Sequence, residues 1–411
     1  MNVSPNFSPP LKIMKPYFIL SGFFYMISMI WIFFLDMNLD IKDFALIGWV
    51  HLYMLGFVML AIFTSMAQLG PIVVETNHYN VNIFKYVWIF LVFGLTLMLI
   101  GFYINTSYLL YGGLLVLIAM SIYAIEFLLT LKTARRKTSI TNAMKMSNFF
   151  LLLGIITGLI MAFVFNGYLD INPHLLLNTH TFGLVVGFVI LLIMGISIIL
   201  IPMFGFSKRL SDNEFHNSFI TLSIGVSIMM FSPLFITTIL QTIAYFITIV
   251  AILLYFYQLY KMHKSRKKVI HDIWARSMYV SFLSFIIAFI SLSSYIVFEN
   301  EIILKFGLFL MLVGFFGFII IGNFYKILPF LIWFQIYSPV IEEQPVPMLH
   351  ELLPKKLTTL QWIYSTLGLF SSSLAILLNN TQLFYGGITL LSVGSVMFFL
   401  IILKIIKTHL H

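Results

Sequence analysis

An apolar run near the start of the chain reads Trp49-Val50-His51-Leu52-Tyr53-Met54-Leu55-Gly56-Phe57-Val58. Its Gly-Phe pair returns at Gly187-Phe188 and at Gly314-Phe315. In each copy the glycine precedes a proline by fifteen residues (56 to 71, 187 to 202 and 314 to 329). The copies lie about 130 residues apart, a period that is too long for a solenoid and suits three bundles of four membrane helices.

The composition places the chain in a membrane. Of its 411 residues, 61% are hydrophobic and 9% are charged, and the mean hydropathy is +1.04. Soluble domains do not have this composition, and apolar runs of about 20 residues recur throughout. We therefore expect an all-α polytopic membrane protein. Cysteine is absent. This excludes disulfides, thiolate nucleophiles, Cys-ligated iron–sulfur clusters and Cys-attached haem.

Twelve membrane spans are predicted, and the repeated stretches fall in the second, sixth and tenth of them. A single transmembrane domain, 1–411, would then consist of three four-helix arcs with pseudo-threefold order, at approximately 1–140, 141–270 and 271–411. The repeat helices would line the interior of that ring. The predicted spans are 17–35, 44–71, 84–103, 107–131, 147–166, 175–204, 217–235, 237–260, 277–297, 303–334, 359–379 and 383–406.

Lysine and arginine are concentrated in alternate loops, including 132–145, 261–276 and 355–356, whereas the opposite loops carry only Lys42 and Lys305. This asymmetry predicts that both termini are cytoplasmic. It also assigns the net charge of +9 to topology, so a nucleic-acid function is not favoured. We expect an integral protein of a bacterial-type inner membrane. Its proline-containing loop 338–358 is interpreted as a connector or a partner contact.

His51 and His180 are the two histidines predicted to lie inside apolar spans. His51 precedes its glycine by five residues, and His180 precedes Gly187 by seven. An offset of two residues is about 200° around an α-helix, so the rings would point from opposite flanks of equivalent helices. In a threefold ring both could enter one gap, which suits a bis-histidine b-type haem. The residues predicted to line that haem are Gly56, Gly187, Trp49 and Phe182.

Other interpretations of these histidines stay open. A histidine in a membrane span can be a hydrogen-bonded structural group, or it can hold a metal ion or line a proton path. His174, at the outer edge, could contact a haem propionate or lie on the surface. His78 was assigned to a cytoplasmic loop without a special role. Glu126, near the cytoplasmic end of its span, was expected to snorkel toward water.

The layout resembles subunit I of the haem–copper oxidases, especially the cbb3 and nitric oxide reductase branch and NnrS-like relatives. The resemblance rests on His51-x4-Gly56-Phe57 with Pro71, His180-x6-Gly187-Phe188 with Pro202, and Gly322-Asn323-x5-Pro329. It implies twelve helices and haem bound by histidines of the repeat helices. In that family the tenth helix carries His-x-His, but this chain has Gly307 and Phe309 there, and no copper ligands are found.

The sequence therefore favours an oxidase-like membrane cytochrome b that holds one haem through His51 and His180, between spans two and six. Electron transfer or haem or gas sensing would be its role, with a respiratory-chain partner or a second copy of the chain as candidate partners. Catalytic oxygen or nitric oxide reduction is not favoured. The alternative is a transporter or channel in which the histidines line the path.

Overall fold

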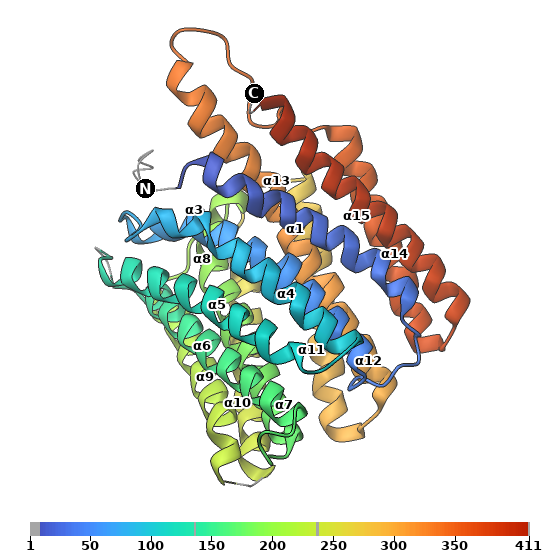
Figure 1. Ribbon diagram of the computed structural model, residues 1–411. Helices are drawn as coiled ribbons and strands as arrows, with labels where there is room; N and C mark the ends of the chain where they lie inside the picture. Colours follow the sequence, from blue (N-terminus) through green and yellow to red (C-terminus); the bar gives the residue numbers. More distant parts are fainter. Residues whose placement is uncertain (1–8, 135–136, 236–237, 410–411) are drawn as a thin grey trace. The chain divides into compact units, whose positions relative to one another are not determined.

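The computed structural model describes residues 9–134, 137–235 and 238–409, and every regular element within them is helical. Figure 1 shows these helices along the chain. The described residues contain eleven helices that are long and apolar enough to cross a membrane. Each predicted span overlaps one helix, although Val87–Tyr103 in the third span has only 17 residues. The expected class, an all-helical polytopic membrane protein, is confirmed.

The described residues divide into two compact units, which we call unit 1 (within 70–270) and unit 2 (within 9–69 and 271–409). Each is described by itself. The prediction of three arcs within one domain stays a prediction. Within its described residues, unit 1 contains α4 (Val87–Tyr103), α5 (Tyr108–Lys132), α6 (Ser139–Phe165), α7 (Pro173–Thr181), η4 (Phe182–Ile190), α8 (Leu191–Gly205), α9 (Asp212–Phe231), η5 (Ser232–Phe235), α10 (Thr238–Lys264) and the short η3 (Val81–Lys85).

Unit 2 contains helices from the beginning and from the end of the chain. α1 packs along α15 in this unit, and α14 packs along α15. Its helices are α1 (Leu11–Trp31), η1 (Ile32–Phe34), α2 (Phe44–His51), η2 (Leu52–Met59), α11 (Ile273–Phe298), α12 (Glu301–Phe309), η6 (Leu310–Phe316), α13 (Gly317–Ile332), η7 (Trp333–Tyr337), η8 (Ser338–Val340), α14 (Lys355–Leu378) and α15 (Thr381–His409). The boundary between the two units falls within α3 (Leu60–Val74).

All three repeat helices widen into a π-helix around the Gly-Phe pair. η2 contains Gly56, η4 contains Gly187 and η6 contains Gly314. π-helical turns are rare and are frequently found at functional sites. Two of them accept a hydrogen bond from a neighbouring helix: Ser21 Oγ donates to the carbonyl of Phe57 in η2 (3.1 Å), and Ser281 Oγ donates to that of Phe315 in η6 (2.9 Å). The sequence repeat is therefore also a repeat of backbone conformation.

The repeated prolines lie inside helices and do not end them at once. α3, α8 and α13 each continue for three residues beyond Pro71, Pro202 and Pro329, respectively. Each proline removes one backbone hydrogen bond of its helix, and the helix continues past it.

Candidate functional site

His51 closes α2, one residue before the π-helix η2 begins. Asp43 fixes the start of this helix, because its carboxylate accepts the backbone N–H of Ala45 at 2.7 Å. The imidazole Nδ1 of His51 lies 2.8 Å from the carbonyl oxygen of Ile47, one turn back on the same helix. The side chain is half-buried. Its orientation is thus set by its own helix.

His180 lies in α7, two residues before the π-helix η4. Its Nδ1 is 2.7 Å from the carbonyl oxygen of Gly154, on the neighbouring helix α6. The ring also covers Gly158 of α6: a Cβ added there would lie 2.6 Å from Cε1. A larger residue at 158 would therefore displace the imidazole. His180 is half-buried like His51, but a neighbouring helix sets its orientation.

Both histidines have the same tautomer when neutral. A carbonyl oxygen can only accept, so in each ring Nδ1 carries the hydrogen and Nε2 carries the lone pair. Histidines that bind metal ions usually have this arrangement, since the hydrogen bond at one ring nitrogen orients the other. His51 belongs to unit 2 and His180 to unit 1, so each is characterised only by its own surroundings.

The residues predicted to line the haem pack within their own units. Trp49 is buried, donates from Nε1 to the carbonyl of Ser28 at 2.8 Å, and stacks on Tyr53 with ring centroids 5.7 Å apart. Phe182 packs edge-on against Tyr245 of α10, with centroids 5.6 Å apart. These contacts account for both aromatic rings structurally. They do not test whether either ring also touches a ligand.

The two glycines of the predicted site allow close helix packing. A Cβ on Gly56 would lie 2.7 Å from the ring of Phe24, and one on Gly187 would lie 2.7 Å from Val226 and 3.0 Å from Phe150. Close approach of neighbouring helices thus accounts for both glycines. Their predicted role in lining a haem stays a prediction.

His174 is exposed, and its backbone N–H donates to the side chain of Asn172 at 3.0 Å as α7 begins. The third repeat has Gly307 at the position equivalent to His180, packed against Ser291 and Leu292 of α11. Among the described residues, no three His, Asp or Glu side chains form a group that could hold a metal ion.

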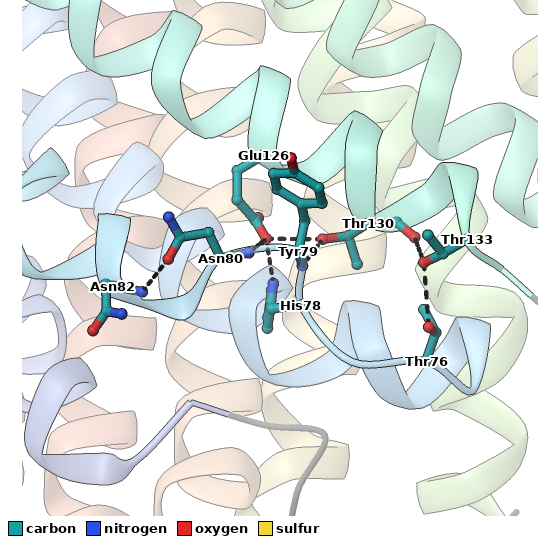
Figure 2. A network of polar contacts seen from close by, with 8 residues as sticks. All are labelled: Thr76, His78, Tyr79, Asn80, Asn82, Glu126, Thr130 and Thr133. Atoms are coloured by element: carbon teal, nitrogen blue, oxygen red, sulfur yellow. Dashed lines mark hydrogen bonds and ion pairs between the residues drawn. The ribbon is translucent and has the colours of Figure 1, made fainter.

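A second polar cluster was missed by the sequence interpretation, and it corrects the expectations for His78 and Glu126. Glu126 is only 3% exposed, and the His78 side chain is fully buried. His78 Nδ1 lies 3.0 Å from Glu126 Oε1. The carboxylate therefore does not snorkel, and the loop histidine has a specific partner 48 residues away. Figure 2 shows the two side chains facing each other.

Hydrogen bonds join the segment between α3 and η3 to one face of α5. Glu126 Oε1 also accepts the hydroxyl of Thr130 (2.8 Å) and the backbone N–H of Asn80 (3.3 Å). Thr130 Oγ1 in turn accepts the N–H of Tyr79 (3.0 Å). A hydrogen bond of 3.2 Å between Thr76 and Thr133 extends the network (Figure 2).

The sequence did contain a signal for this cluster. Glu126, Thr130 and Thr133 are spaced by four and three residues, so they share one face of a helix that is otherwise apolar. An acidic residue within a membrane span needs a partner. That partner could not be identified from the sequence, because it lies in a loop that only the tertiary fold brings to α5.

Comparison with models of known protein families gives no match, and no characterised protein has significant sequence similarity to this chain.

Proposed function

We propose that this chain is a membrane cytochrome b that holds one haem through His51 and His180, with electron transfer or haem or gas sensing as its role. The proposal includes the twelve-span topology with both termini cytoplasmic. It also retains the resemblance to haem–copper oxidases without their oxygen-reducing centre. The proposal is based on the positions of the two histidines in the repeated helices and on the tautomer of their imidazole rings.

The observation that carries the proposal is the shared tautomer. A haem iron takes an axial imidazole through a nitrogen lone pair, and each ring presents that lone pair on Nε2 because Nδ1 donates to a carbonyl. Ligation requires the neutral form of the ring. Each histidine adjoins a π-helix, where helices frequently depart from regular geometry for a functional reason.

Bound haem would supply one-electron redox chemistry and a site for small gases. The contribution of the protein would be to fix the ring planes: the Ile47 carbonyl orients His51, and the Gly154 carbonyl and the Gly158 surface orient His180. The surrounding apolar helices would exclude water, and that exclusion is one of the factors that set a haem reduction potential.

The test is the haem content and reduced-minus-oxidised spectrum of the protein purified from cells supplied with haem. We expect about one b-type haem per chain and a sharp low-spin α band. His51→Ala and His180→Ala should each lose the low-spin signal. His174→Ala is the matched control, because it changes an exposed histidine of the helix that carries His180, and it should retain the haem.

A colourless wild-type preparation would contradict the proposal. So would normal spectra in both single variants, because two axial ligands cannot both be dispensable to a low-spin bis-histidine haem. Loss of haem in His174→Ala together with the other two would indicate a general folding defect and would remove the support that the single variants give.

A further inference from the structure

Unit 2 contains an open pocket of about 500 Å³ where α14 begins and α15 ends. Its polar lining is mainly basic: Lys355 and Lys356 come from the first turn of α14, and Lys404 comes from the last part of α15. Leu353, Pro354 and Leu357 provide the apolar part of the wall. The helices α14 and α15 run side by side (Figure 1). Together they bring three amino groups to one hollow.

The pocket has an excess of positive charge. All three lysines are exposed, and the ion pairs found within the described residues involve none of them. Glu351 is the one acidic residue of the lining, and its Oε2 accepts the backbone N–H of Met348 at 2.8 Å. Three lysines around one glutamate leave a net positive charge, which attracts an anion. A phosphate group, which accepts hydrogen bonds at several oxygens, suits the point charges of lysine.

An apolar stripe continues from the pocket along α14. Its large side chains are exposed and follow one another every three or four residues, so they lie on one face of the helix. The stripe consists of Leu360, Ile363, Leu367, Phe370, Leu374 and Leu377. On α15, exposed Leu400 lies one turn from Lys404. A molecule held at the lysines would therefore have hydrocarbon-binding surface directly beside it.

We propose that this pocket binds the headgroup of an anionic phospholipid, with the phosphate at Lys355, Lys356 and Lys404 and the acyl chains along the stripe of α14. Basic pockets at the ends of membrane helices on the cytoplasmic side bind acidic lipid headgroups. The combination of cationic pocket and adjoining apolar face favours a lipid over a small soluble anion, because inorganic phosphate would use only half of the surface. The proposal does not depend on haem.

The experiment adds phosphatidylglycerol or phosphatidylcholine with identical acyl chains to the detergent-solubilised full-length chain, and bound lipids are counted by native mass spectrometry. We expect preferential retention of phosphatidylglycerol. Changing the three lysines together to serine should reduce that preference by roughly tenfold, since each cation near a lipid surface contributes attraction. The corresponding triple change to arginine should keep it.

A matched control changes Lys264, Lys267 and Lys268 to serine, which removes the same charge from unit 1. This control should retain the preference for phosphatidylglycerol. Equal loss in the control, or an unchanged preference in the Lys355/Lys356/Lys404 variant, would overturn the site. Two soluble competitors separate a lipid site from a small-anion site: inorganic phosphate and glycerophosphoglycerol, which is the lipid headgroup without its acyl chains. If both displace bound phosphatidylglycerol at the same concentration, the pocket is a small-anion site and the lipid assignment is overturned.

Discussion

His180 and His78 both belong to unit 1, and their rings are held in opposite ways. His180 donates to the uncharged carbonyl of Gly154, whereas His78 faces the carboxylate of Glu126. The carbonyl fixes Nδ1 of His180 as the donor, whereas the carboxylate oxygen of Glu126 also accepts the Thr130 hydroxyl and the Asn80 N–H and so joins a loop to α5. The partner of the ring, more than its depth in the protein, thus separates a histidine suited to bind iron from one suited to fasten a loop.

The largest expected effect on stability concerns the contact between His78 and Glu126. Glu126→Ala would remove the acceptor that serves His78, the Thr130 hydroxyl and the Asn80 N–H, and each buried polar group left without an acceptor lowers the free energy of unfolding by about 1–3 kcal/mol. Thermal or denaturant unfolding of the detergent-solubilised protein measures it. Glu343→Ala, at an exposed site in unit 2, should change stability little. A shift of Glu126→Ala no larger than that of the control would mean that the pair does not hold the loop.

Gly158→Ala tests the contact between α6 and the ring of His180. The added Cβ would lie 2.6 Å from His180 Cε1 and 2.8 Å from Nδ1, so the ring must move. Overpacking of this kind lowers stability by about 1–3 kcal/mol, and we also expect reduced haem occupancy or a changed low-spin spectrum. In Gly113→Ala the nearest atom would be Leu159 Cδ1 at 3.2 Å, so its haem should be unaffected. Wild-type spectra in Gly158→Ala would argue against iron ligation by His180.

His78→Asn distinguishes the packing of the ring from its hydrogen bond. An asparagine amide can still donate to Glu126 Oε1 but fills less of the buried space than the imidazole, so we expect a loss of about 1–2 kcal/mol in unfolding free energy. Haem content should stay at the wild-type value. Loss of haem in this variant without a loss of stability would reverse the roles assigned to the two histidines.

The smallest expected effect concerns the end of the network. Thr133→Val removes the hydroxyl that bonds Thr76, in a partly exposed position, and should lower stability by about 0.5–1.5 kcal/mol. Thr96→Val is the control, because Thr96 bonds only back to Val92 within its own helix. Equal effects of the two changes would show that the Thr76–Thr133 contact contributes nothing specific.

The positions of the helices could be predicted from the sequence because apolar runs bounded by charged loops fix membrane spans. The π-helices could not be predicted. In a helix that is apolar on every side, as around Gly187, no polar face reveals the period, so α-helical and π-helical winding cannot be told apart from the sequence. The repeat predicted three equivalent places in the chain, and the structure adds that their backbones share one unusual form.

The candidate site was predicted only in part. The register of His51 and His180 predicts opposite flanks of their helices, and this stays a prediction. The hydrogen bond of each ring, to the same helix for His51 and to α6 for His180, could not be read from the register. The roles of Trp49 and Phe182 in lining a ligand stay predictions. The contacts of His78 could not be predicted, because no local pattern connects residue 78 with residue 126.

The wide turns of the repeat helices have a consequence for engineering. A π-helical segment holds more residues per turn than an α-helix, so removing one residue from it can restore regular winding without breaking the chain. A single deletion inside η4 would then leave the residues beyond it in their present orientation, because the wide turn accommodates one extra residue. Pro202 and the rest of α8 would keep their present neighbours, whereas the same deletion inside the regular helix α6 would turn all later residues of that helix by about 100°.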